Sequence, residues 1–187
     1  EAVGHAIVQA SHLMAKVHYR AYHDPLTELG NRALFYELVQ HQLATAARAN
    51  RQLSILAIDL DNFKVVNDEE GHAAGDQLLA AVARRLEATI RAADAAARMG
   101  GDEFSILLVD AGEESATEAA HRLVAELGKP YPGIQTRVSA SIGIAVYPQA
   151  GADLAELLEN ADRALYAAKR GGRNTCRLAG CAKISEV

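Results

Sequence analysis

The feature that most restricts the fold of this chain is a pair of glycines, Gly100 and Gly101, between two strand-like segments. Small residues fill 94–99 before the pair, and large apolar residues fill 104–109 after it. Because glycine adopts positive φ without a Cβ clash, two glycines between strands predict a tight hairpin. Asp102 and Glu103 directly follow the glycines. Taken alone, these acids are more often solvated turn residues than a functional site, since short motifs match by chance.

Apolar periodicity on both sides of the hairpin predicts a mixed α/β domain. Some segments repeat apolar residues at helical spacing, whereas others alternate or run together as strands do. After the leading helices the expected order is β-α-β-β-α-β, which indicates an α+β two-layer sandwich with a central, mostly antiparallel sheet flanked by helices. Two helices are expected over about 32–49 and 73–91, and two more are expected to begin at capping residues Ser115 and Asp153. The expected strands span 53–58, 94–99, 104–109, 138–146 and 175–178. Residues 62–75 are expected to form a connection.

Composition argues against two classes of function. The net charge of −5 argues against a surface that binds a nucleic-acid polymer. No apolar run approaches the roughly 20 residues that span a bilayer, so no membrane contact is expected from this chain itself. Cys176 and Cys181 are the only cysteines, which argues against a disulfide framework or a zinc site and favours a reducing, cytoplasmic environment.

Acidic residues are expected to meet where two strands end. The buried strand over 53–58 leads to Asp59 and Asp61, and the hairpin with Asp102 and Glu103 is able to pair beside it. Carboxylates brought together repel one another unless a cation lies between them. Hard divalent cations such as Mg²⁺ prefer carboxylate oxygens and accept phosphate as a further ligand, so the pattern indicates a metal–phosphate site. Candidate phosphate partners are Lys64, Lys169 and Arg173, although each one alone is more often a solvated surface charge.

Five blocks of the chain occur in a recognisable order and spacing. They are Asp24-Pro25-Leu26-Thr27-x-Leu29-x-Asn31-Arg32, Asp59-Leu60-Asp61-x-Phe63-Lys64-x-x-Asn67-Asp68-x-x-Gly71-His72-x-x-Gly75-Asp76, Arg98-x-Gly100-Gly101-Asp102-Glu103-Phe104, Ser141-Ile142-Gly143-Ile144-Ala145 and Ala161-Asp162-x-Ala164-Leu165-Tyr166-x-Ala168-Lys169-x-x-Gly172-Arg173-Asn174. In these blocks the chain resembles the GGDEF domain of bacterial diguanylate cyclases. Several blocks at matching spacing are far more specific than one. The resemblance also implies a fold similar to nucleotidyl cyclases and polymerase palms.

The resemblance implies an activity and assigns residues to it. Two GTP molecules would condense into cyclic di-GMP and release two pyrophosphates, in a homodimer that brings two active sites face to face. The implied catalytic and metal-binding groups are Asp59, the carbonyl of Leu60, Asp102 and Glu103, with two Mg²⁺ or Mn²⁺ ions per site. The implied substrate-binding residues are Asn67 and Asp76 for guanine, Lys64, Lys169 and Arg173 for phosphate, and Gly100 and Gly101 for close approach of the nucleotide. The pattern Arg91-x-x-Asp94, with Arg122 as a third member, matches an inhibitory site for the product.

The same resemblance divides the chain into parts. Apolar residues from Val3 to Ala21 follow a heptad seam, which predicts either a coiled coil or a helix packed on its own domain. We expect a linker helix to an upstream sensor over 1–22, the catalytic domain over 23–178 and a tail over 179–187. Because the chain starts at Glu1 without an initiator Met, it is expected to be part of a longer protein, cytoplasmic or the cytoplasmic part of a membrane-anchored signalling protein.

One position departs from the family pattern. Glu28 stands where the family usually has glycine, and the neighbouring Gly30 is expected to take over the turn. Two alternatives to a cyclase stay open at this point. One is a non-catalytic domain that binds GTP or cyclic di-GMP and signals by contact. The other is a palm-like nucleotidyl transferase that acts on another substrate, against which Asn67 and Asp76 argue.

Overall fold

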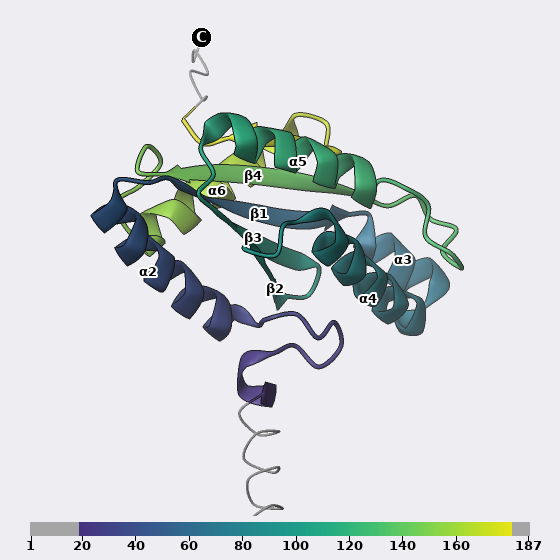
Figure 1. Ribbon diagram of the computed structural model, residues 1–187. Helices are drawn as coiled ribbons and strands as arrows, with labels where there is room; N and C mark the ends of the chain where they lie inside the picture. Colours follow the sequence, from purple (N-terminus) through teal and green to yellow (C-terminus); the bar gives the residue numbers. More distant parts are fainter. Residues whose placement is uncertain (1–18, 181–187) are drawn as a thin grey trace, which may run out of the picture.

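Strand β1 (Leu53–Asp61) lies at the centre of the sheet, and all but one of its residues are buried. The computed structural model describes residues 19–180 (Figure 1). The strands lie side by side in the order β2-β3-β1-β4-β5, and every neighbouring pair is antiparallel except β4 and β5. The other elements are α2 (Arg32–Ala49), α3 (Phe63–Glu70), α4 (His72–Thr89), β2 (Ala95–Gly100), β3 (Glu103–Val109), α5 (Glu113–Leu127), β4 (Ser139–Tyr147), α6 (Leu154–Arg170) and β5 (Thr175–Leu178).

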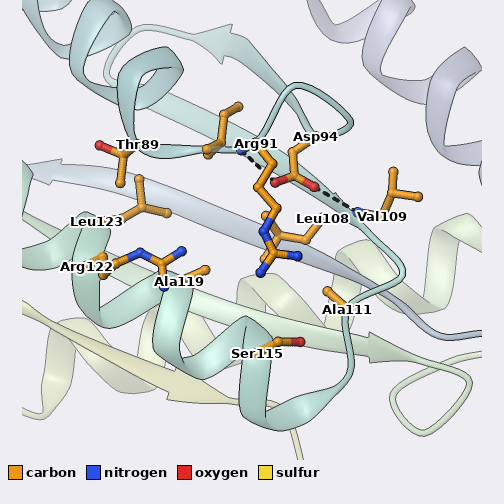
Figure 2. Close-up of a pocket in the computed structure, with 11 residues that line it drawn as sticks. Thr89, Arg91, Asp94, Leu108, Val109, Ala111, Ser115, Ala119, Arg122 and Leu123 are labelled. Carbon is orange, nitrogen blue, oxygen red and sulfur yellow. Dashed lines mark hydrogen bonds between the residues drawn. The ribbon is translucent and has the colours of Figure 1, made fainter.

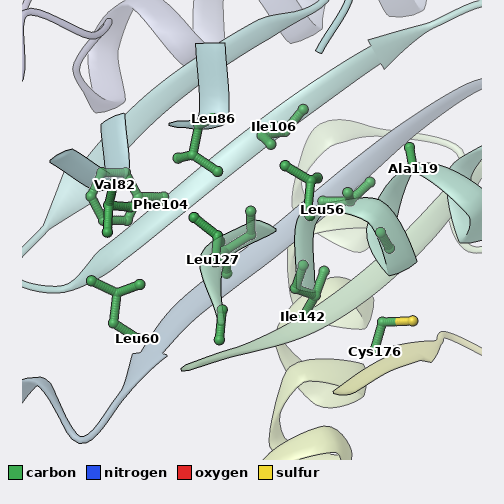
Figure 3. Close-up of a cluster of buried hydrophobic side chains, with 14 of the residues drawn as sticks. Leu56, Leu60, Val82, Leu86, Phe104, Ile106, Ala119, Leu127, Ile142 and Cys176 are labelled. Carbon is green, nitrogen blue, oxygen red and sulfur yellow. The ribbon is translucent and has the colours of Figure 1, made fainter. Parts of the chain in front are cut away.

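The two faces of the sheet carry separate hydrophobic clusters. Leu56, Ile58 and Leu60 of β1 pack with apolar residues of α4 and α5 on one face (Figure 3). Leu53 and Ile55 alternate with them and pack with α2 and α6 on the other face. The predicted mixed α+β fold with a mostly antiparallel sheet is confirmed. The number of layers is corrected from two to three, because helices cover both faces.

Two local predictions were wrong. Residues 62–75 contain helix α3, where a connection was expected, because α3 is short and buries only Val66 fully, so its apolar period is weak. Helix α5 begins at Glu113 instead of at a capping box, and the Ser115 hydroxyl donates to the carbonyl of Gly112. By contrast, the predicted cap of α6 is confirmed, because the Asp153 carboxylate accepts from the Glu156 N–H at 2.9 Å.

The segment that leads into α2 differs from expectation at one residue. Glu28 has a φ of 62°, the left-handed conformation that favours glycine, so it makes the turn itself and Gly30 does not take it over. Most of the predicted heptad seam lies in residues 1–18, and the end of the predicted tail lies in residues 181–187; both are outside the described residues. Residues 19–22 are helical. Across residues 19–180, no helix is both long and apolar enough to cross a bilayer.

Candidate active site

The glycine hairpin has the geometry that its sequence predicts. Gly100 and Gly101 have φ values of 147° and 51°, which a residue with a side chain rarely adopts. A Cβ at either position would have no heavy atom within 4 Å, so this side of the turn is open. Gly100 pairs with Glu103 across the turn, after a bulge that follows Arg98. The two glycines therefore leave an unobstructed backbone in front of the acidic residues.

Strand pairing brings the predicted carboxylates to one end of the sheet. Asp59 on β1 is the register partner of Glu103 on β3, and the Leu60 N–H donates to the carbonyl of Asp102 at 3.3 Å. Asp59 also forms an ion pair with Lys169 near the end of α6, with 2.7 Å between Oδ2 and Nζ. The hairpin and the centre strand thus meet at Asp59, as the sequence pattern indicates, and α6 meets them there through Lys169.

The electrostatics at Asp59 fit a cation-binding position. Burial raises the pKa of Asp59, the Lys169 ammonium partly offsets this rise, and the carboxylates of Asp102 and Asp61 raise the pKa further. In the part of the chain that the structure describes, no three His, Cys, Asp or Glu side chains are close enough to hold a metal ion. Carboxylates that repel one another at a strand end are nevertheless the oxygen donors that hard divalent ions prefer. The donor chemistry of Asp59, Asp102, Glu103 and the Leu60 carbonyl fits such an ion.

Asp61 has a set of contacts that the sequence did not reveal. Its Oδ2 accepts from the Ser139 hydroxyl at 2.7 Å and from the backbone N–H of Asn174 at 3.0 Å. Its Oδ1 accepts from the Ser141 hydroxyl at 2.8 Å and lies 4.0 Å from Nε of Arg173. The side chain is only 2% exposed. The serines were part of the strand pattern, but no sequence signal indicated that this carboxylate joins β4 to the turn after α6.

The candidate phosphate-binding cations differ in their surroundings. Lys169 is half-buried in its ion pair with Asp59, and Arg173 is 62% exposed in the turn between α6 and β5. Lys64 is exposed on α3, and no contact among the described residues links it to the other two. The structure therefore joins Lys169 and Arg173 to the strand end, whereas Lys64 contributes charge from the neighbouring helix.

The candidate guanine-reading residues lie on two packed helices. Asn67 is on α3 and Asp76 is on α4, and the two helices are joined at Gly71. A Cβ added at Gly75 would lie 2.0 Å from Oδ1 of Asn67. The Asn67 side chain therefore lies directly against the backbone beside Asp76. The sequence pattern contained Gly75, but this contact depends on α3, which sequence periodicity missed.

Arg91, Asp94 and Arg122 line one pocket, together with apolar residues of β3 and α5 (Figure 2). Asp94 fixes the turn between α4 and β2, since its two oxygens accept from the N–H groups of Arg91 and Val109 at 3.0 and 3.1 Å. Both guanidinium groups belong to exposed residues. The fold thus brings Arg122 of α5 to the turn that holds Arg91 and Asp94 and presents two positive charges at one pocket.

Arg98 connects the glycine hairpin to the turn that precedes α2. Its guanidinium donates to both oxygens of Asp24 at 3.1 and 3.2 Å and to the carbonyl of Gly101 at 3.0 and 2.8 Å. Both charged side chains are largely buried, with 14% and 18% exposed. The sequence pattern contained Arg98 and Asp24 in separate blocks, and their pairing becomes visible only in the folded chain.

Comparison with known proteins agrees with this geometry. The family model described as "Diguanylate cyclase, GGDEF domain" matches residues 21–175. The chain is 47% identical over 157 residues to the bifunctional diguanylate cyclase/cyclic di-GMP phosphodiesterase MucR of Pseudomonas aeruginosa, which covers 82% of this chain and 23% of that protein. It is 41% identical over 169 residues to the diguanylate cyclase TpbB of the same species, which covers 88% of this chain and 39% of that protein.

A solved structure extends the likeness to three dimensions. The coiled coil and GGDEF domain of DgcB from Caulobacter crescentus, in complex with c-di-GMP, aligns with a TM-score of 0.85 at 27% identity and 95% coverage of both chains. The chain therefore shares its fold over nearly the whole length of that structure, whereas it spans well under half the length of the two curated relatives.

Proposed function

The chain belongs to the GGDEF family of diguanylate cyclases, and from this membership we propose that it condenses two GTP molecules into cyclic di-GMP and two pyrophosphates. The observation that carries the proposal is the strand register that sets Asp59 opposite Glu103, with the Lys169 ammonium 2.7 Å from Asp59. Acidic oxygen donors and a phosphate-binding cation at one strand end are what phosphoryl transfer needs.

The roles of the side chains follow from their chemistry. Asp59, Glu103 and the Leu60 carbonyl would hold two Mg²⁺ or Mn²⁺ ions, with Asp102 assisting. Ions held there supply activation of the ribose 3′-hydroxyl and neutralisation of charge on the α-phosphate and the leaving pyrophosphate. Lys169 and Arg173, with Lys64 nearby, bind the phosphates of GTP as positively charged donors. The open backbone at the two glycines of the hairpin gives the nucleotide room to approach.

Asn67 and Asp76 select guanine in this proposal. A carboxylate is able to accept from both N1–H and the exocyclic amine of guanine, whereas adenine offers no such pair of donors. A good bidentate contact of this kind discriminates between bases by about 1–3 kcal/mol. The support for this assignment is the packing of α3 on α4, which holds Asn67 beside the residue that precedes Asp76.

Each chain carries one such set of residues, so the product requires two copies of the chain. The 3′-hydroxyl of the GTP bound to each chain attacks the α-phosphate of the GTP bound to the other chain. The catalytic species is therefore a two-fold homodimer, in which the same surface of each chain faces its partner.

Turnover in mixed nucleotides tests the proposal against its two alternatives. Incubation with Mg²⁺ and equal GTP and ATP should consume GTP, and the nucleotide products should contain cyclic di-GMP. A binding domain that signals by contact would leave both nucleotides unchanged. A transferase for another substrate would consume ATP as readily as GTP, and either of these results would contradict the proposal.

The pocket lined by Arg91, Asp94 and Arg122 supports a second part of the proposal, which is feedback inhibition by cyclic di-GMP. Two guanidinium groups beside one pocket suit the phosphates of a cyclic dinucleotide. The solved DgcB structure contains c-di-GMP, which supports binding of this ligand in the family without locating it in this chain.

Substitution of Arg91 tests feedback inhibition. Arg91→Ala should raise the cyclic di-GMP concentration that halves activity by about tenfold or more, since a hydrogen bond to a charged group is lost. The initial rate without added product should stay close to that of the parent chain. Arg84→Ala, at an exposed position of the preceding helix α4 that does not line the pocket, is the matched control. Unchanged product inhibition in Arg91→Ala would rule out this site.

A further inference from the structure

Asp61 is a buried carboxylate whose acceptor capacity is almost fully used. A carboxylate offers about four lone-pair positions. Three are taken by the hydroxyls of Ser139 and Ser141 and by the N–H of Asn174, at 2.7, 2.8 and 3.0 Å. With 2% of its side chain exposed, Asp61 has no surface left for a nucleotide. Its neighbour Asp59, two residues earlier on the same strand, carries the ion pair with Lys169.

The turn that Asp61 contacts has an unfavourable backbone conformation. Arg173 and Asn174 have φ values of 61° and 48°, so two successive residues with side chains are left-handed. Such a conformation persists only where the surrounding contacts determine it. The Asn174 N–H is held by the Asp61 carboxylate, and the Arg173 N–H donates to the carbonyl of Ala168 at 3.2 Å. The first of these is a charge-assisted bond and hence the stronger type.

The same carboxylate also sets the direction of the Arg173 side chain. Nε of Arg173 lies 4.0 Å from Oδ1 of Asp61, while most of the side chain is exposed to solvent. A fixed negative charge beside one nitrogen of the guanidinium restricts the positions that this group occupies. The anchor is rigid, because Asp61 is itself held by two hydroxyls of β4.

We propose that Asp61 is a positioning residue for the triphosphate of GTP, acting through the Asn174 N–H and the Arg173 guanidinium. It joins the end of β1, which carries Asp59, to the turn that carries Arg173. Asp61 touches neither the nucleotide nor a metal ion. Its removal misplaces the Arg173 guanidinium, which binds the outer phosphates. The inference rests on the proposed function, since it assigns a partner to the phosphate-binding side of that site.

Nucleotide binding without turnover tests this inference. The ligands are 3′-deoxy-GTP, which lacks the attacking hydroxyl, and GMP, which lacks the outer phosphates. Titration calorimetry with Mg²⁺ compares the parent chain with Asp61→Asn, which keeps the shape but removes the charge and one acceptor oxygen. Affinity for 3′-deoxy-GTP should fall about tenfold, while affinity for GMP should change less than about twofold. Asp110→Asn, an exposed acid paired with Arg51, is the control.

A double substitution separates positioning from a general loss of structure. In an Arg173→Ala background, Asp61→Asn should weaken 3′-deoxy-GTP binding by less than about twofold, because the residue through which it acts is gone. Amide hydrogen exchange at Asn174 should be faster in Asp61→Asn than in the parent chain. If Asp61→Asn fails to fold, Ser139→Ala gives the same comparison, since its hydroxyl shares Oδ2 of Asp61 with the Asn174 N–H.

The outcomes are distinguishable. Equal 3′-deoxy-GTP affinity in the parent chain and Asp61→Asn, or an equal loss for GMP, would overturn the inference. So would a full loss in the Arg173→Ala background, which is the result expected of a metal ligand. If the parent chain bound no 3′-deoxy-GTP at all, the proposed function itself would fail and this inference would fail with it.

Discussion

Gly75 has no side chain because the amide of Asn67 occupies the space where one would be. A Cβ at Gly75 would meet Oδ1 of Asn67 at 2.0 Å. Alanine is otherwise the better helix former, by up to about 1 kcal/mol. A buried glycine inside α4 therefore costs helix stability, and the position of Asn67 is the physical reason for it.

Replacing Gly75 should change base recognition rather than folding. In Gly75→Ala the Asn67 side chain must rotate away, so we expect the preference for GTP over ATP in kcat/KM to fall about tenfold. The thermal unfolding midpoint should not decrease, because the helix gains a better residue. Gln77→Ala, an exposed position of the same helix, should change neither quantity. A full GTP preference in Gly75→Ala would show that Asn67 does not read the base.

For single residues, the sequence predicted which strand ends meet but few of the individual contacts. The pairing of Asp59 with Glu103 followed from two strands and a hairpin, which periodicity and glycine chemistry reveal. The conformation of Glu28 did not follow, because φ at a single residue depends on contacts with the rest of the fold. Its N–H donates to the carbonyl of Asp24 at 2.8 Å, which closes the turn around that residue.

An ion pair between Asp24 and Arg98 helps to join the turn before α2 to the glycine hairpin. Burial tends to raise the pKa of Asp24, but hydrogen bonds from the Thr27 hydroxyl and N–H and from Arg98 outweigh it, and the pKa lies below its ordinary value. A carboxyl group with a lowered pKa in the folded state stabilises the fold above its ordinary pKa. That contribution is lost as the pH falls through the lowered value.

Acid titration of stability tests this connection between elements. The unfolding midpoint of the parent chain should fall more between about pH 5 and pH 3 than that of Asp24→Asn, which has no proton to gain at this position. The comparison cancels the contributions of the other carboxyl groups, which both proteins share. Parallel curves for the two proteins would mean that the Asp24–Arg98 contact does not stabilise the hairpin.

Long elements with strong periodicity were predicted correctly, and short ones that depend on neighbours were not. Helices α2, α4 and α6 each have a broad apolar face that a single sequence displays. Helix α3 buries one residue fully and is held by its packing on α4, so its pattern resembles a polar loop. The start of α5 was misplaced because Ser115 bonds backward to Gly112 instead of capping.

On the scale of the whole molecule, the sheet separates two hydrophobic clusters and places the candidate active site where its strand ends meet α6. The apolar run over residues 55–58 of β1 is typical of a strand covered on both faces, so the sequence already contained a sign of the third layer. The prediction of two layers followed the element order instead, which does not say on which face each helix packs.

The need for two copies predicts how activity depends on protein concentration. In the proposed mechanism each chain binds one GTP, so the rate per chain should rise with concentration until the dimer is saturated, in keeping with mass action. The measurement is the initial rate of cyclic di-GMP formation over a dilution series of this chain. A rate per chain that stayed constant over the whole series, down to the most dilute sample, would contradict assembly during catalysis.

A product analysis that compares this chain with Glu103→Gln in GTP and Mg²⁺ tests the proposed cyclase activity and the role of the hairpin acids together. GTP, cyclic di-GMP and pyrophosphate are quantified, and circular dichroism verifies that the variant is folded. The parent chain should form cyclic di-GMP together with two pyrophosphates for each molecule of it, and Glu103→Gln should form no cyclic di-GMP. Equal cyclic di-GMP from both proteins would contradict the assignment of the hairpin acids, and none from the parent chain would contradict the proposed activity.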